Sequence, residues 1–316
     1  MNAFLTRLGG LLAVLFGTSF ITFAVTYFAP GDKALSIAQA RYPGEMGFDS
    51  AVLDGIRAEF HLDRPFLSQY LYWLADFVTG DFGRSYSSQS KVWDIFAGNL
   101  AETFTLAFTA LALGLTAAFL LAGLAVWKQG SLLDRFAILL ASVGAAIPSF
   151  WLSILLIMLF AAHLGWLPAY GTGTAAHLVL PAVTLAFWVM SSQTRLLRSF
   201  LLEAYAQPFV ETLRLRGVSE REIFFSHVLR HAMPPALTMI GLDLAGLIEG
   251  AVVVEIIFAR SGLGSLLAGS VLARDLPVVV FLVMFFALTY VLINTLIDLV
   301  QIVMDPRQRA AERAEV

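Results

Sequence analysis

Long apolar runs and polar stretches alternate along this chain of 316 residues. An α-helix of about 20 residues rises roughly 30 Å, the thickness of a bilayer's hydrocarbon core, so each run is long enough to cross it. The pattern predicts an all-α polytopic membrane protein with six transmembrane helices. The predicted spans cover residues 9–28, 103–127, 136–162, 178–197, 235–258 and 277–304.

A long polar segment, residues 29–98, separates the first two predicted spans, and we place it outside the cell membrane. Asp49 stands where it would begin a helix that runs to Phe60. Gln69, Tyr70 and Trp73 then recur at helical spacing, which indicates an amphipathic helix. Trp and Tyr are typical of the membrane interface.

The stretch from residue 203 to residue 235 is arginine-rich and too polar to be a span. Ser219 and Glu222 fit a capping box, in which each side chain bonds the other residue's backbone amide. Ile223, Phe224, Val228 and Leu229 would form one apolar stripe on the helix that follows. Gly217 stands where a helix over residues 208–216 must end in a left-handed turn. The pattern predicts two short helices at an angle.

This stretch resembles the cytoplasmic coupling loop of ABC importer permeases, in the oligopeptide, dipeptide and nickel branch. Glu211 and Gly217 match the general Glu-Ala-Ala-x3-Gly pattern, but Thr212 and Leu213 replace the two alanines. The general Ile-x-Leu-Pro ending is absent, and a later proline pair stands in its place, as is usual in that branch.

Other segments are similar to the same branch in the expected order. They are LDRPFLSQYLYWL with Gly80–Ser85, the run IPSFWLSILLIMLFAAHLGWLPAYG, the run GAVVVEIIFARSGLG, and Asp305-Pro306-Arg307. The resemblance therefore reaches from residue 69 to residue 307.

The resemblance implies a permease subunit built as four parts. Residues 1–28 hold the N-terminus and first transmembrane helix, and 29–98 form the extracytoplasmic segment. Residues 99–308 form a five-helix core with the coupling loop at 199–235, and 309–316 form a cytoplasmic tail. The residues expected to couple to an ATPase are Glu211, Arg214, Arg216, Gly217, Ser219 and Glu222.

The expected partners follow from the same resemblance: a second homologous permease subunit, two ABC ATPase subunits, an extracytoplasmic solute-binding protein and membrane lipid. The chain's three lysines do not follow a glycine, so the sequence has no Walker A motif, whose backbone amides and lysine cradle ATP. We expect no cofactor in this chain, with ATP and Mg²⁺ bound by the partner ATPases.

Three acidic residues, Asp243, Glu249 and Glu255, lie in the fifth predicted span. Charges at the bilayer centre are costly and generally face a bundle interior or water. They are candidates for a translocation pathway. Glu255 matches the family, whereas Glu249 stands where the family usually has glycine, so its role cannot be carried over.

The positive-inside rule sets the orientation. The short loops that carry Lys128, Arg135, Arg195 and Arg198, and the arginine-rich stretch, fall on the side of the N-terminus. We therefore expect both termini in the cytoplasm of a bacterium, with the chain in its inner (plasma) membrane.

Composition excludes several function classes. Hydrophobic residues make up 59% and charged residues 14%, against roughly 25% charged in soluble domains. There is no cysteine, and a net charge of −3 does not indicate nucleic-acid binding. His227 and His231 are four apart, but we favour a surface role over a metal site. We predict no catalytic residue in this chain.

The substrate stays open at this point. Short peptides are the first expectation and nickel or a metal chelate the second. A self-sufficient channel or ion-driven carrier would transport without partners, and polar groups in the last two spans could line its pore. A membrane enzyme would use Asp243, Glu249 or His163 as acid or base, but the sequence offers no nucleophile–base pair.

Overall fold

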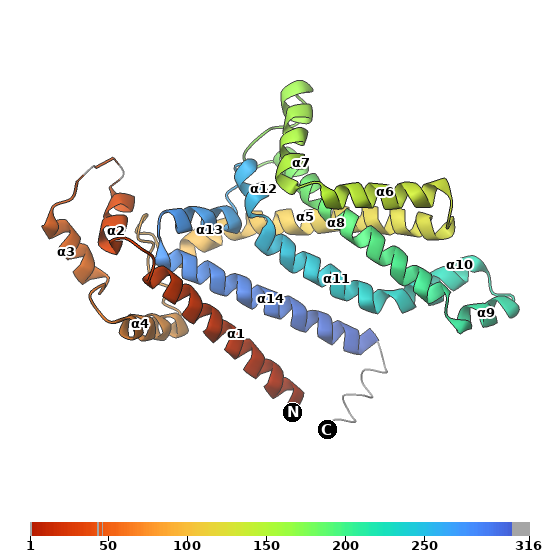
Figure 1. The fold of residues 1–316 in the computed structure, drawn as a ribbon, viewed down its shortest axis with the longest axis horizontal. Helices are drawn as coiled ribbons and strands as arrows, with labels where there is room; N and C mark the ends of the chain where they lie inside the picture. The colour runs from red at the N-terminus through yellow and green to blue at the C-terminus, as the bar shows by residue number, and fades with distance from the viewer. Residues whose placement is uncertain (1, 43, 46, 305–316) are drawn as a thin grey trace. The chain divides into compact units, whose positions relative to one another are not determined.

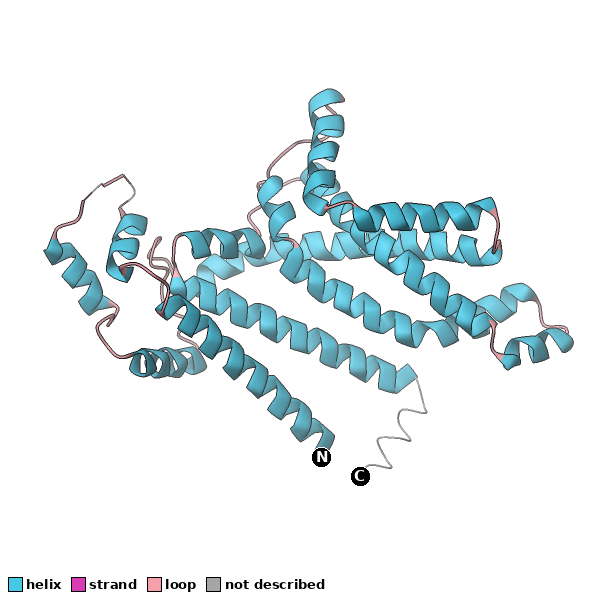
Figure 2. Cartoon of the chain, in the orientation of Figure 1, coloured by secondary structure: helices cyan, strands magenta, loops and turns pink. Residues whose placement is uncertain are grey.

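The computed structural model of the protein describes residues 2–42, 44–45 and 47–304, and the predicted tail at 309–316 and the Asp305–Arg307 motif lie outside them. Every regular element in the described part is a helix (Figure 2). The elements are α1 Asn2–Tyr27, α2 Lys33–Arg41, α3 Ser50–Glu59, α4 Phe66–Thr79, α5 Val92–Trp127, α6 Leu132–Ala146, α7 Ser149–Leu156, η1 Ile157–His163, α8 Ala175–Tyr205, α9 Pro208–Leu215, α10 Glu220–Glu222, η2 Ile223–Val228, α11 Leu229–Gly250, α12 Val252–Ile257, α13 Leu263–Leu272 and α14 Leu276–Met304, where η marks a π-helical segment.

Five helices of the described part are long and apolar enough to cross a membrane, and a bent pair makes a sixth candidate. These are Gly9–Tyr27, Val92–Trp127, Ala175–Tyr205, Glu220–Glu249 and Leu276–Gln301, with the pair Leu132–Ala146 and Ser149–His163. The chain is therefore an all-α polytopic membrane protein, and the six predicted spans each correspond to one of these candidates.

The third predicted span, residues 136–162, contains Pro148, and an interior proline predicts a kinked helix. The structure has a sharper break at that position. The chain bends by 101° between α6 and the helix that starts at Ser149 (Figure 1). Ile147 and Pro148 adopt extended backbone angles at the break. Proline disfavours the helical conformation of the residue before it, which explains why the helix ends at Ala146 instead of bending gently.

The fifth predicted span also differs from the structure. We expected a short helix, a break and a span from Pro235, but Glu220–Glu249 is one helical stretch of 30 residues. Pro234 and Pro235 lie inside it. The π-helical turn η2 precedes them, and Gln301 donates a hydrogen bond to the carbonyl of Pro234. The second helix of the predicted loop is thus the beginning of the span, which then turns at Ala251 into α12.

The chain divides into two compact units: Met1–Glu102 with Ser261–Val291, and Thr103–Arg260 with Leu292–Val316. In the first unit, Tyr70 of α4 is fully buried against aromatic residues of α1 such as Phe20 and Phe23. Its hydroxyl also hydrogen-bonds Ser19. The amphipathic helix predicted around Tyr70 is confirmed as α4, and it packs along the first span.

Close helix contacts organise the second unit around α8. A Cβ added at Gly114 of α5 would lie 2.8 Å from the carbonyl oxygen of Ala186, and one added at Gly144 of α6 would lie 3.0 Å from the Phe187 ring. No side chain fits at these points, because packed interiors leave no spare volume. Glycine therefore lets α5 and α6 approach α8 at these crossings.

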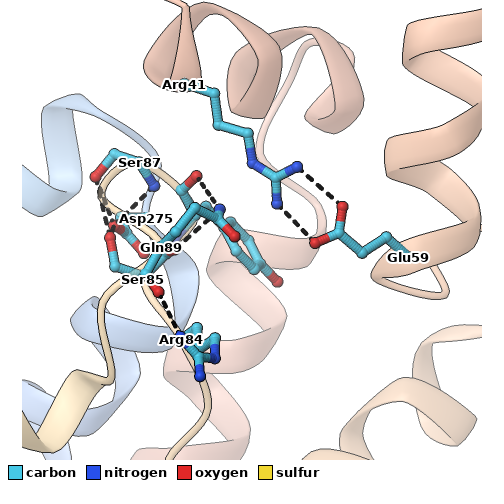
Figure 3. Close-up of polar contacts among 8 residues, drawn as sticks. Arg41, Glu59, Arg84, Ser85, Ser87, Gln89 and Asp275 are labelled. Carbon is cyan, nitrogen blue, oxygen red and sulfur yellow. Dashed lines mark hydrogen bonds and ion pairs between the residues drawn. The ribbon is translucent and has the colours of Figure 1, made fainter.

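Helices α2 and α3 pair outside the spans through a small core of Ala34, Ile37 and Ile56. Arg41 adds a bidentate ion pair with Glu59, with N–O distances of 2.8 and 2.9 Å (Figure 3). The hydrogen bonds that Arg41 donates to the Glu59 carboxylate lower the pKa of Glu59 below its usual value.

We predict a pH-dependent pairing of α2 and α3. Because the pKa of Glu59 is lower in the folded state than in the unfolded state, its ionised form stabilises the folded state at neutral pH. This stabilisation is lost as the pH falls from about 4.3, the pKa of a free glutamate, through the lower pKa of the folded state. Hydrogen-exchange protection of residues 33–41 and 50–59, corrected for intrinsic exchange, should fall in that range. Glu59→Gln should remove this step, whereas Asp63→Asn should keep it. A step of unchanged size in Glu59→Gln would contradict the prediction.

Candidate functional site in the loop after the fourth span

The loop between α8 and α11 begins with the short helix α9, which ends in a tight left-handed turn. Gly217 has φ +78°, and its amide donates to the carbonyl of Arg214 at 2.9 Å. The amide of Val218 donates to the carbonyl of Leu213 at 3.1 Å. These two bonds make a Schellman motif, in which glycine avoids the steric cost of the left-handed conformation. The predicted helix end and turn are confirmed.

The next helix begins as the sequence predicts. The Ser219 hydroxyl accepts a hydrogen bond from the amide of Glu222 at 3.3 Å, which is the serine half of the predicted capping box. Figure 1 shows α9 and α10 as two short helices at an angle at the end of α8. The cap therefore fixes where the fifth span starts.

Arg214 connects the two helices across the turn. Its Nε donates to Glu220 at 2.5 Å and its Nη2 at 3.2 Å, and Glu211 lies 3.9 Å from the same guanidinium. Both sides of the pair are substantially exposed, so its contribution to stability is small. Its bidentate geometry nevertheless restricts the angle between α9 and α10.

An apolar seam lies beneath the loop and joins it to three long helices. We call this cluster the loop seam; its buried members are Ala118, Ala122 and Val126 of α5, Leu197, Leu201 and Ala204 of α8, Val210 of α9, Ile223 and Val228 of η2, and Ala232 and Ala236 of α11. Phe224 and Leu229 pack against it, so the predicted apolar stripe is confirmed. The loop is thus held by the packing of the spans themselves.

The outer face of the loop carries the residues that the sequence singled out. Glu211, Arg214, Arg216, Gly217, Ser219 and Glu222 are all exposed. Two large apolar side chains accompany them, since Leu215 is 81% exposed and Phe225 is 56% exposed. A mixed charged and apolar face on a well-packed base is suited to docking another protein.

The two histidines near the loop do not form part of a metal cluster in the described residues, where no group of three potential ligands was found. His231 instead packs its ring edge-on against Phe209, with centroids 5.7 Å apart.

The three acidic residues of the fifth span occupy different environments. Asp243 is buried and accepts a hydrogen bond from Gln193 of α8 at 2.5 Å. Glu255, on α12, is fully buried and accepts one from Thr103 of α5 at 2.6 Å. Glu249 is exposed on the single chain. The structure therefore does not gather the three candidates into one site, and two of them join helices within the unit.

Two polar contacts were not foreseen from the sequence. One is a bidentate ion pair between Arg198 and the buried Asp134, at 2.7 and 2.9 Å, which joins the ends of α8 and α6. Partners 64 residues apart leave no local signal, although a charge beside an apolar run is a hint that a partner exists.

The other contact is made by Asp275, a residue between α13 and α14 that is only 2% exposed (Figure 3). Its carboxylate accepts hydrogen bonds from the Ser85 hydroxyl at 2.5 Å, the Tyr86 amide at 3.0 Å and the Ser87 hydroxyl at 3.0 Å. Burial, and then the nearby Asp275 charge, raise the pKa of Tyr86. One carboxylate thus anchors the segment after α4.

Removing this carboxylate should release the anchored segment. Asp275→Ala removes the acceptor of the Tyr86 amide, and the Ser85 hydroxyl keeps only the Ser87 hydroxyl at 3.1 Å as a possible acceptor. A buried donor left without a partner costs about 1–3 kcal/mol. Hydrogen exchange of residues 83–90 should accelerate strongly, and less so in Asp275→Asn. The exposed Asp81 accepts a hydrogen bond from the Gly83 amide and, within the described residues, makes none with the partners of Asp275, so Asp81→Ala is the control. Equal acceleration in both alanine variants would refute the anchoring role.

Helices of this length and packing define a polytopic membrane protein, and three comparisons show its class. Residues 100–310 match the family described as binding-protein-dependent transport system inner membrane component, and residues 1–107 match the N-terminal part of such components.

A protein of Brucella abortus (strain 2308) named as a peptide transport system permease is 36% identical, covering 96% of this chain and 98% of that protein. The glutathione transport system permease protein GsiC of Escherichia coli (strain K12) is 34% identical, covering 98% and 99%. A solved structure of the MetNI methionine ABC transporter is similar in fold, with a TM-score of 0.57 at 17% identity, covering 67% of this chain and 96% of that one.

The chain therefore belongs to the family of binding-protein-dependent transport system inner membrane components, and the resemblance to ABC importer permeases drawn from its motifs is confirmed. It is a multi-pass inner-membrane protein of the permease class.

Proposed function

We propose that this chain is the permease subunit of an ATP-driven importer that carries short peptides delivered by an extracytoplasmic binding protein. The observation that carries the proposal is the loop seam, which joins an exposed docking face to α5, α8 and α11. A movement imposed on α9 and α10 must displace these helices, because close-packed side chains transmit displacement and do not absorb it.

The mechanism is alternating access between two arrangements of the bundle. ATP binding would draw two ATPase subunits together, and each would move one coupling loop. Such coupling requires an element that makes different contacts in the two states. Glu211, Arg214, Arg216 and Glu222 would supply the polar contacts with the ATPase, and Leu215 would supply an apolar contact.

The proposed partners follow from what the chain contains. It has no Walker A motif, so ATP and Mg²⁺ belong on the ATPase subunits. A second homologous permease would complete the pathway, and the binding protein would dock on the extracytoplasmic side. This assignment places both termini and the arginine-rich loop in the cytoplasm, as the positive-inside rule expects.

The cargo proposal rests on the relatives, which are named for peptide and glutathione transport. Glutathione is itself a tripeptide. Of the three acidic residues of the fifth span, Asp243 and Glu255 are engaged by Gln193 and Thr103, while Glu249 is exposed. We therefore keep Glu249 as the candidate that faces the pathway in the complete transporter.

Gly217→Val should uncouple ATP hydrolysis from transport. A β-branched residue in the left-handed region costs at least about 1–2 kcal/mol and would re-angle α9 and α10. A Cβ at Gly217 meets no atom within 4 Å, so the effect is on the backbone and not on packing. In liposomes that hold the complete transporter, ATPase activity should persist while peptide uptake falls at least about tenfold.

Gly130→Val is the matched control, because Gly130 is also left-handed, at φ +77°, and has equally open surroundings in a different short loop. That variant should transport nearly as well as wild type. Normal uptake by Gly217→Val, or equal loss in both variants, would count against the coupling role.

Affinity purification from the native membrane in mild detergent should recover a second permease and two ATPases with this chain. Reconstituted with its binding protein, the complex should take up short peptides only when ATP is present. A chain that is recovered alone and transports solute by itself would show the single-subunit carrier instead. Uptake of Ni²⁺ in place of peptides would overturn the cargo proposal alone.

A further inference from the structure

A cavity of about 240 Å³ lies in the first unit, at the ends of two candidate spans. Its lining includes Val25 and Thr26 of α1, Ile37 of α2, and Val279 of α14, and most of the lining is apolar. Span ends coincide with the headgroup level of a bilayer. We therefore expect this mostly apolar cavity to lie near the depth of the lipid phosphates.

Two cations line the same cavity: Lys33, at the start of α2, and Arg274, between α13 and α14. The Lys33 ammonium lies 3.5 Å from the centroid of the Tyr27 ring. Arg274 has φ +54° and donates to the Ser36 hydroxyl at 3.4 Å. Its guanidinium also packs against Gly31, and the Cβ of any other residue at position 31 would lie only 2.5 Å from Nη1. The glycine therefore leaves room for this guanidinium at the cavity.

The carboxylates next to the two cations in sequence are engaged by other groups. Asp32 caps α2 through the Ala34 amide and pairs with Arg57 at 2.6 Å. Asp275, next to Arg274 in sequence, is occupied by Ser85, Tyr86 and Ser87. Within the described residues neither Lys33 nor Arg274 forms an ion pair. Two positive groups beside an apolar cavity thus lack an anion.

The geometry points to a binding site for the phosphate of an anionic phospholipid, with part of an acyl chain in the apolar lining. Basic pockets between transmembrane helices recognise lipid headgroups on the cytoplasmic side of membranes, and the same attraction between cations and a phosphate applies at the other end of the spans. The volume is close to the lower end of small-molecule pockets, roughly 300–1,000 Å³, so it suits one headgroup and the beginning of a chain. A lipid held there would link α1, α2 and α14 of this unit.

Native mass spectrometry of the delipidated transporter tests this assignment. The titrants are phosphatidylglycerol, zwitterionic phosphatidylethanolamine and glycerol 3-phosphate. Phosphatidylglycerol should bind most tightly. Lys33→Gln and Arg274→Gln should each weaken it about fivefold, and the double variant about 25-fold, since one surface cation contributes that much to anionic lipid binding. Lys33→Arg, which keeps the charge, should restore most of the affinity.

Arg64→Gln is the matched control, because Arg64 belongs to the same segment but stacks on Tyr72, outside the cavity. Phosphatidylglycerol should also slow hydrogen exchange of residues 31–37 in wild type and not in the double variant. This local readout separates the site from lipid bound elsewhere on the apolar surface.

Several results would overturn the assignment. Equal binding of phosphatidylethanolamine would exclude recognition of net charge, and equal binding of glycerol 3-phosphate would assign the site to a free phosphate. Wild-type affinity in the double variant would exclude the two cations. Full protection of residues 31–37 in the delipidated complex, with no change on adding lipid, would mean that a partner subunit fills the cavity.

Discussion

The loop seam is the constraint on which the proposed action of this protein depends. Small residues of α5, α8 and α11, such as Ala122 and Ala232, let these helices approach closely enough for Ile223 and Val228 to be buried among them. The exposed Arg214–Glu220 pair above the seam adds little stability but restricts the angle between α9 and α10. Packing therefore holds the loop to the spans, while polar groups define the surface that it presents.

The continuity between the loop and the fifth span strengthens this view. A flexible connection before Pro235 would let the loop move by itself. The helix from Glu220 to Glu249 instead starts at the Ser219 cap and carries its direction into the membrane span. In the proposed mechanism, a rigid connection of this kind would convert a small displacement at Gly217 into a tilt of α11, the type of movement that alternating access requires.

Much of the fold and the local geometry of the loop could be predicted from the sequence. Six apolar runs, the Ser219 cap and the left-handed Gly217 are local signals, and all three are confirmed. The break at Pro148 was underestimated, because the sequence shows a proline but not whether neighbours will support a kinked helix. Contacts such as Arg198 with Asp134 and Ser85 with Asp275 join residues far apart in sequence, and one sequence alone does not reveal such pairings. The family resemblance supplied the proposed roles of the loop residues, which physical reasoning from the residues could not.

The most direct test of the central claim is a distance across the loop seam in the working transporter. The chain has no cysteine, so a single spin-labelled pair, Thr212→Cys on α9 and Leu124→Cys on α5, can be introduced at exposed positions outside the proposed ATPase contacts. The account predicts one narrow distance distribution that is the same with and without ATP, because loop and helix move as one body. A distribution that broadens or shifts with ATP would show that the loop moves independently of the spans, and would contradict the account.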